Sequence, residues 1–320
     1  MTFVFKKIKA KPRKKTGDPE AILDRLNRYL QSVSAAPAKF LVSFWKDQEG
    51  AFTYKEIREA ILRGDITEEE VEEWQQDYSK MVEDKMKPMW IAAIKAGSRG
   101  QPIFDGLPEG FSIKTGVPDI IDWIENRGAE FVTSVTRDQK NAIKALLEKS
   151  VVNRFSVDEL ARTIRPCIGL TEGQARANLR YYEHIKETLR ENHPKMKAKS
   201  IEKKAREAQI KYAAKQHRER AITIAQTEMA FAYNKGADET IRQGQAAGLF
   251  GVMEKRWVTS GKSNVCDYCN SLNGTQIGMD TEFDFPGKTL FPGQKLTPPA
   301  HPRCCCVLQY IEISPPVIKD

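Results

Sequence analysis

Histidine is scarce in this sequence, and cysteine is missing from its first half. The 320 residues include only four histidines and six cysteines, and the first cysteine is Cys167. No apolar run approaches the roughly 18 residues that a membrane-spanning helix needs, so we expect no membrane insertion. The sequence opens without an apolar signal segment, which argues against secretion and against a disulfide framework. We therefore expect a globular, soluble protein of the cytoplasm.

The sequence also lacks the motifs of common zinc enzymes. It contains no His-Glu-x-x-His helix, and the deaminase pattern fails because Val265, and not a proline, precedes Cys266. The consecutive carboxylates of Glu68, Glu69 and Glu70 stand where an expected helix begins, so capping explains them better than acid–base catalysis. We expect no catalytic residues and no enzymatic activity.

Five of the six cysteines gather near the C-terminus. Cys266 and Cys269 are separated by two residues, a spacing that lets a tight turn direct two sulfurs at one zinc ion. Further along, the proline-rich segment 298–302 contains His301 and leads into the run Cys304-Cys305-Cys306. This combination predicts a structural zinc site. Free or disulfide-bonded cysteines are the alternative.

The three consecutive thiols can be separated by strand periodicity. Residues 306–311 favour extended chain, so Cys304 and Cys306 should share one face and Cys305 should lie on the other. Five candidates then remain for the four positions of a tetrahedral site. The preferred ligands are Cys266, Cys269, Cys304 and Cys306. In the alternative set, His301 replaces one of the last two.

Helix-start signals recur through the rest of the sequence. Capping residues stand before apolar residues at helical spacing at Asp18, Thr67, Ser156 and Thr171. The patterns predict a short helix over 119–126, a longer one over 130–149, a charged helical stretch over 195–220, an amphipathic helix over 221–247 and a strand over 251–259. The predicted fold class is mostly α, with helical N-terminal and middle regions and a small α+β, zinc-stapled C-terminal module.

Positive charge exceeds negative charge by eight, and the isoelectric point is near 9.0. Part of the excess lies in residues 1–17, which should form a flexible tail. This tail is either an arm that binds DNA or an acidic partner protein, or a solvated end without a target. Its candidate binding residues are Lys6, Lys7, Lys9, Lys11, Arg13, Lys14 and Lys15. The stretch 195–220 is also basic but has few aromatic residues, so phosphate contact and a merely solvated helix face are both open, whereas base stacking is not supported.

A series of short motifs near the C-terminus resembles a known family. The motifs are Ala225-Gln226-Thr227-Glu228, Ala232-Tyr233-Asn234-Lys235-Gly236, Lys255-Arg256-Trp257, Cys266-Asp267-Tyr268-Cys269 with Asn273-Gly274, and Pro298-Pro299-Ala300-His301-Pro302-Arg303-Cys304-Cys305-Cys306. Their order and spacing resemble the phage head morphogenesis family of Mu F-like minor capsid proteins, and a looser resemblance extends back to about Val151. The family usually has an arginine at the position of Gln226 and a His-Pro-Asn-Cys-Arg-Cys ending, where this sequence has Arg303 and Cys305. The resemblance marks Glu228 and Trp257 as characteristic positions, for which we expect structural roles.

The resemblance implies a minor head protein of a tailed bacteriophage, found in the virion head and, during assembly, in the host cytoplasm. The implied partners are the portal protein, the major capsid protein or scaffold, and packaged double-stranded DNA. The alternatives are a zinc-containing DNA-binding protein and a metal-dependent nuclease. We expect a basic tail over 1–17, a helical N-terminal domain with a linker over 18–118, a head morphogenesis domain over 119–313 with its Cys/His module at 252–313, and a C-terminal tail over 314–320.

Overall fold

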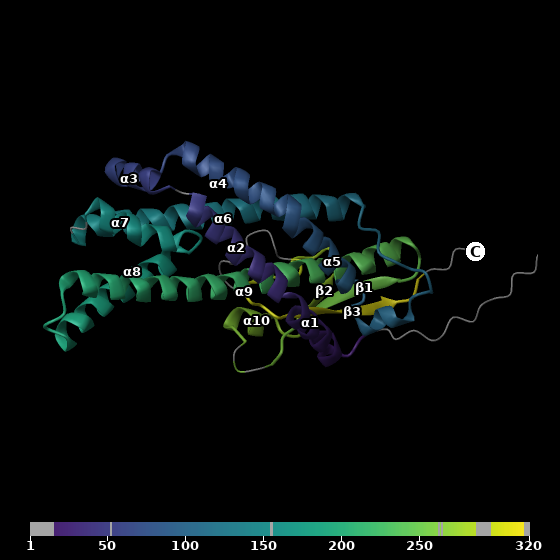
Figure 1. Cartoon of the computed structure of the whole chain (residues 1–320). Helices are drawn as coiled ribbons and strands as arrows, with labels where there is room; N and C mark the ends of the chain where they lie inside the picture. The colour runs from purple at the N-terminus through teal and green to yellow at the C-terminus, as the bar shows by residue number, and fades with distance from the viewer. Residues whose placement is uncertain are drawn as a thin grey trace, which may run out of the picture. The chain divides into compact units, whose positions relative to one another are not determined.

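The computed structural model describes residues 16–51, 53–153, 156–261, 263, 265–285 and 296–316 (Figure 1). The basic residues between Lys6 and Lys15 lie outside this range. The chain divides into two compact units, each assembled from separate segments. Unit 1 takes Met1–Ser34, Pro88–Ile121 and Ile224–Asp320, and unit 2 takes Ala35–Lys87 and Asp122–Thr223. The predicted fold class is confirmed, because helices predominate and a small antiparallel sheet lies near the C-terminus.

Unit 2 is helical over its described residues. It contains α2 (Ala35–Ala51), α3 (Tyr54–Arg63), α4 (Glu68–Met81), a π-helical turn (Val82–Met86), most of α6 (Pro118–Asn153), α7 (Val157–Ile164), α8 (Glu172–Asn192) and the first half of α9 (Ala198–Ala246). The predicted caps at Thr67, Ser156 and Thr171 are confirmed as reciprocal capping boxes. In the core, the indole N–H of Trp45 donates to the Tyr78 hydroxyl at 3.0 Å.

The division of residues 119–149 into two helices was wrong, because α6 runs through the whole segment. Gly128 lies at the expected break, but a single glycine inside a helix costs only about 1 kcal/mol relative to alanine. The neighbouring Arg127 is buried and donates to Glu130 at 3.0 Å, one turn further along the same helix. The two helical stretches predicted over 195–247 also form one helix, α9.

Unit 1 builds a three-stranded sheet beside helices. Its elements are α1 (Pro19–Val33), most of α5 (Lys87–Gly97), a 3-10 turn (Pro102–Gly106), the second half of α9, β1 (Val252–Val258), α10 (Asp267–Leu272), β2 (Gln276–Gly278) and β3 (Val307–Ser314). The strand order is β2-β1-β3, and both pairings are antiparallel, with Lys255 on the central strand opposite Ile277 and Tyr310. The strand predicted over 251–259 is thereby confirmed.

Two glycines let α5 and α9 approach closely in unit 1. A Cβ on Gly97 would lie 1.9 Å from the backbone oxygen of Tyr233, and a Cβ on Gly236 would lie 2.0 Å from that of Ile94. Both distances are far shorter than any real carbon–oxygen contact, so each position requires glycine. This explains Gly236, the last residue of the Ala-Tyr-Asn-Lys-Gly motif.

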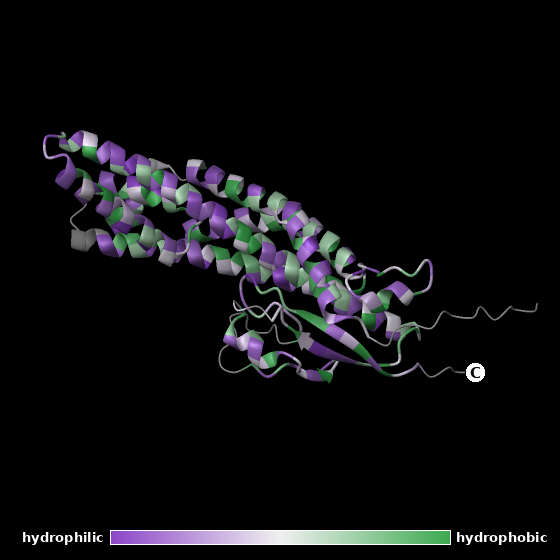
Figure 2. Cartoon of the chain, turned by 90° about the horizontal axis from the view of Figure 1, so that it is seen from below, coloured by the Kyte–Doolittle hydropathy of each residue, from purple (hydrophilic) through white to green (hydrophobic). Residues whose placement is uncertain are grey.

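Hydrophobic residues recur between hydrophilic ones along the helices and strands (Figure 2). The core of unit 1 lies between the sheet and α9 and includes Trp257, Phe283, Cys269, Cys304 and Cys306. Three of the candidate metal ligands are therefore core residues. None of the described helices combines the length and the apolar character needed to cross a membrane.

Candidate metal centre

Cys266 and Cys269 are placed by the start of α10. Cys266 is the N-cap residue of this helix, and its Sγ accepts the backbone N–H of Cys269 at 3.4 Å. Asn273-Gly274 ties the end of α10 to β1: the N–H of Gly274 donates to the Trp257 carbonyl at 2.9 Å, and Gly274 has a positive φ of 85°. One sulfur is partly buried and the other fully buried.

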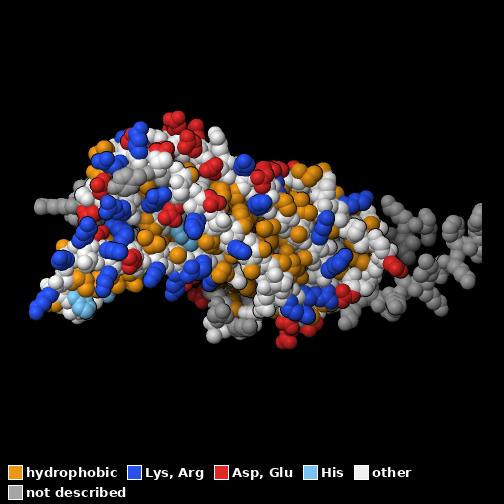
Figure 3. Space-filling view, in the orientation of Figure 1, with side chains coloured by type: hydrophobic (Ala, Val, Ile, Leu, Met, Phe, Trp, Pro, Cys, Tyr) orange, Lys and Arg blue, Asp and Glu red, His pale blue; other side chains and the backbone are white. Residues whose placement is uncertain are grey.

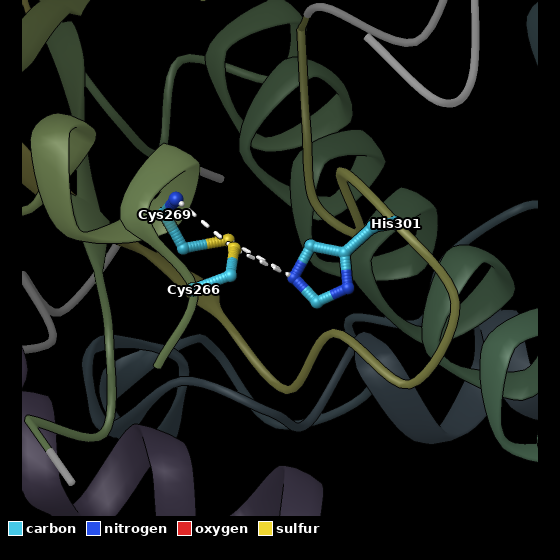
Figure 4. Close-up of side chains that lie close together, drawn as sticks. All are labelled: Cys266, Cys269 and His301. Carbon is cyan, nitrogen blue, oxygen red and sulfur yellow. Dashed lines mark hydrogen bonds between the residues drawn. The ribbon is translucent and has the colours of Figure 1, made fainter. Parts of the chain in front are cut away.

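His301 enters the site from the loop before β3 and faces this pair (Figure 4). Its Nε2 lies 3.1 Å from the Sγ of Cys266 and 3.4 Å from that of Cys269. Its other ring nitrogen, Nδ1, lies 2.8 Å from the carbonyl oxygen of Pro302. A proton on Nδ1 would be held by that carbonyl, which leaves the Nε2 lone pair directed at the sulfurs, as in metal-bound histidines.

Cys304 and Cys306 complete the cluster, while Cys305 points away. The Sγ atoms of Cys269 and Cys304 are 3.7 Å apart. Cys304 and Cys306 are buried and Cys305 is exposed, so the predicted separation of these three thiols is confirmed. The donor atoms form two groups, Cys266/Cys269/His301 and Cys269/Cys304/Cys306, with all separations within each group at most 4.8 Å.

These separations suit a tetrahedral zinc ion. With Zn–S bonds of about 2.3 Å, two sulfurs on a tetrahedron lie about 3.8 Å apart, close to the distance between Cys269 and Cys304. The donors are soft sulfurs and an imidazole, which are the usual ligands of structural zinc. All five sequence-predicted ligands come together. His301 lies close to both sulfurs of the Cys-x-x-Cys pair, so the structure favours it as a metal ligand more strongly than the sequence spacing did.

The thiols and the imidazole influence one another's ionisation. Hydrogen bonds from Cys269 and Cys306 hold the pKa of Cys304 well below its usual value, whereas the pKa values of Cys269 and Cys306 are raised. The Cys304 sulfur raises the pKa of His301 to about 9. A bound metal ion would displace the remaining protons.

A contact from α9 holds the ligand loop in place, and Trp257 of β1 packs in the core beside it. The hydroxyl of Thr227, on α9, accepts a hydrogen bond from the backbone N–H of Arg303 at 3.0 Å. Arg303 lies between His301 and Cys304 in the sequence. Arg303 has a φ of 59°, in the left-handed region that asparagine adopts more readily than arginine. Trp257 is fully buried and makes edge-on contacts with Phe283 and Phe285, with ring centroids 5.1 and 5.7 Å away. The Thr227 contact gives the Thr-Glu motif a physical role at this site.

Comparison with known proteins identifies the family. The sequence model of the phage Mu protein F-like family matches residues 141–309, more than half of the chain. This chain belongs to the Mu F-like family. The match includes all five candidate ligands, together with Glu228 and Trp257, and confirms the family that the sequence motifs indicated.

The Mu F-like chain is also similar to the uncharacterized protein YqbB of Bacillus subtilis (strain 168). The two are 38% identical over 97 residues, which cover 28% of this chain and 30% of YqbB. The chain therefore matches about a third of the length of this curated relative. No solved structure matches.

The Mu F-like motif Lys255-Arg256-Trp257 contains a buried cation that sequence reasoning missed. Lys255 is fully buried on β1, donates to the carbonyl of Met279 at 2.8 Å, and has its pKa lowered to about 8, chiefly by burial. Close by, the Tyr310 hydroxyl donates to Asp238 at 3.4 Å, and Arg242 bridges Asp238 and Asp280 at 2.8 and 2.7 Å. This network links α9 to the sheet. The sequence signal for this buried cation was a lysine in the middle of a strand whose apolar and polar residues alternate.

Three further side chains with ionisable groups lie away from the metal centre's Cys/His groups. Glu228, for which a structural role was predicted, is buried on α9. Cys167 is fully buried in unit 2, 3.6 Å from the Asn178 side-chain oxygen. His217, also in unit 2, bonds the carbonyl of Ile168 through Nε2 at 2.8 Å, and burial lowers its pKa to about 4. Within the described residues, neither Cys/His group includes these side chains.

Proposed function

We propose that this chain is a minor head protein of a tailed bacteriophage or prophage and acts in head assembly. The observation that carries the proposal is the family match over residues 141–309, which covers the whole metal centre and helices α7, α8 and α9 before it. The expected partners are the portal protein and the major capsid protein or scaffold, with packaged double-stranded DNA as a further partner. The protein would then reside in the virion head and, during assembly, in the host cytoplasm.

In this proposal the metal centre is structural, and the chain is not an enzyme. A zinc ion bound by four of the five candidates would cross-link the start of α10 to the loop before β3, and supply no catalytic chemistry because four protein ligands leave no open position for water. The cluster lies in the hydrophobic core of unit 1, with the Thr227 contact joining the same loop to α9. The zinc-stapled surface would serve as a rigid docking site for another head protein.

For the ligand set, we propose Cys266, Cys269, Cys304 and His301 in preference to four thiols. The two short distances from His301 to the Cys-x-x-Cys pair support this choice. Replacing zinc by cobalt(II) tests it, because sulfur-to-metal charge-transfer absorption grows with the number of thiolate ligands. His301→Ala should change the cobalt spectrum and Cys306→Ser should leave it unchanged. The reverse result would establish the four-thiol site.

Fractionation of a phage lysate tests the assembly role. The polypeptide, followed by mass spectrometry, should sediment with proheads or virions in low copy. The double variant Cys266→Ser/Cys269→Ser should lose the metal and its place in heads together, whereas the matched variant Cys305→Ser, at an exposed thiol, should keep both. Normal heads that contain the metal-free double variant would refute the docking role. A polypeptide that stays free while heads form normally without it would refute the head assignment itself.

A further inference from the structure

A groove in unit 2 combines aromatic rings with lysines on adjacent helices. Tyr181 of α8 packs against Tyr212 of α9, with ring centroids 4.7 Å apart and an angle of 40° between the rings. The groove beside them has a volume of about 600 Å³ and is also lined by Lys204, Lys211, Lys215 and Glu207. The sequence showed few aromatic residues in this basic stretch of α9. The fold supplies the missing ring from α8.

The surface around this Tyr–Lys groove is strongly basic. Lysine and arginine side chains crowd the end of α8 and the start of α9 (Figure 3). Over residues 195–220, eight cations are exposed against two exposed carboxylates, Glu207 and Glu219; the cations are Lys195, Lys197, Lys199, Lys203, Lys204, Lys211, Lys215 and Arg218. A few surface ion pairs, such as Lys215 with Glu219 at 3.8 Å, do not balance this excess.

The three groove lysines form a row along α9. At 3.6 residues per turn, Lys204, Lys211 and Lys215 fall within about 40° of arc, and the row is roughly 16 Å long. Duplex DNA carries one negative charge per about 1.7 Å of its axis, so a duplex segment of this length carries on the order of ten phosphates on its two strands. Tyrosine hydroxyls also donate to phosphate oxygens, and exposed tyrosine rings can stack on unpaired bases.

We propose that the Tyr–Lys groove binds the sugar–phosphate backbone of nucleic acid. The charge excess supplies the attraction, the row of lysines supplies contacts at several phosphates, and the two tyrosines add hydroxyl donors and ring faces beside them. The inference deepens the proposed function by giving its DNA partner a site, but it does not depend on the metal centre, because it concerns unit 2 and can be measured on the purified full-length protein. Its failure would leave the proposed head role untouched.

Salt-dependent binding of a short DNA duplex, followed by fluorescence anisotropy, tests the proposal. The variant Lys204→Ala/Lys211→Ala/Lys215→Ala should lower the slope of log affinity against log salt by about 2.7, since each phosphate contact contributes about 0.9. Between roughly 50 and 200 mM salt, this change corresponds to about a 40-fold smaller loss of affinity. The control is Lys55→Ala/Lys80→Ala/Lys85→Ala, which removes the same charge from exposed positions elsewhere in unit 2. Equal effects of the two triple variants would overturn the proposal.

Two further arms identify what the groove recognises. Tyr212→Phe keeps the ring and removes the hydroxyl, so a loss of duplex affinity points to a phosphate contact. Tyr212→Ala should weaken binding of a single strand more than Tyr212→Phe does, if bases stack on the ring. Either pattern supports a nucleic-acid site and shows whether it recognises duplex or single-stranded nucleic acid. Polyglutamate that binds as tightly as DNA, with the same loss in the groove variant, would instead assign the groove to an acidic protein and overturn the proposal.

Discussion

Replacing Gly236 by alanine should destabilise the protein, although alanine is the better helix former. Gly236 lies inside α9, where this replacement alone would stabilise the helix by about 1 kcal/mol. The new methyl group, however, would lie 2.0 Å from the backbone oxygen of Ile94. Normal contact needs more than 3 Å, and a backbone atom cannot rotate away as a side-chain end does. The two helices would have to separate by about 1 Å or more along their contact.

The balance of these two effects gives the magnitude. Overpacking a tight contact costs about 1–3 kcal/mol and sometimes more, and here the clash is at the severe end of that range. After subtraction of the helix-propensity gain, we expect a net loss of about 2 kcal/mol in the free energy of unfolding. The separated helices would also lose part of the apolar packing between α5 and α9.

Chemical denaturation followed by circular dichroism measures this effect. The matched control is Gly173→Ala in α8, where an added Cβ meets nothing within 4 Å. This control should be neutral or stabilising, by up to about 1 kcal/mol. Opposite signs for the two variants would support the glycine contact. A Gly236→Ala variant as stable as the wild type would refute the close crossing of α5 and α9.

Three further substitutions test contacts around the site and the core of unit 2. Thr227→Val removes the acceptor of the Arg303 N–H and should destabilise unit 1 by about 1–2 kcal/mol in denaturation; an unchanged stability would show that the contact is dispensable. Arg303→Asn relieves the left-handed backbone and should raise the unfolding free energy by about 0.5–1 kcal/mol, so a destabilised variant would contradict the assigned strain. The pKa of His217 is lowered to about 4 in the folded protein, so unfolding takes up a proton below the ordinary value of 6.5. The stabilisation that the neutral His217 contributes to the folded protein is complete above pH 6.5 and is lost as the pH falls toward 4, by about 3 kcal/mol at most. His217→Gln should therefore flatten this part of the pH–stability curve relative to the wild type. Parallel curves for the two proteins would rule out the buried neutral imidazole.

Local patterns in the sequence predicted the elements that local interactions determine. The capping residues Thr67 and Ser156 form the expected capping boxes because their partners lie three residues away. The separation of Cys305 from Cys304 and Cys306 followed from the alternation of extended chain. The Cys-x-x-Cys pair and the proline-rich approach to His301 were likewise visible, because both are short motifs.

Features that depend on distant segments could not be predicted in the same way. Tyr181 and Tyr212 meet only because α8 and α9 lie side by side, and the close approach at Gly97 and Gly236 joins residues far apart in the sequence. Each compact unit combines segments that are separate in the sequence, so its assembly depends on tertiary contacts. The burial of Lys255 is also a tertiary effect, since its solvation depends on how the core closes over β1.

The most direct test of the account is the metal content of the purified chain, measured by native mass spectrometry together with a count of free thiols. The account predicts one zinc ion per chain, and chelation that removes it should unfold the region around α10 and the loop before β3. In zinc-finger peptides the metal contributes roughly 10–16 kcal/mol, so the loss of structure should be large. A metal-free chain with this region intact, or disulfide bonds among Cys266, Cys269 and Cys304, would contradict the structural metal centre.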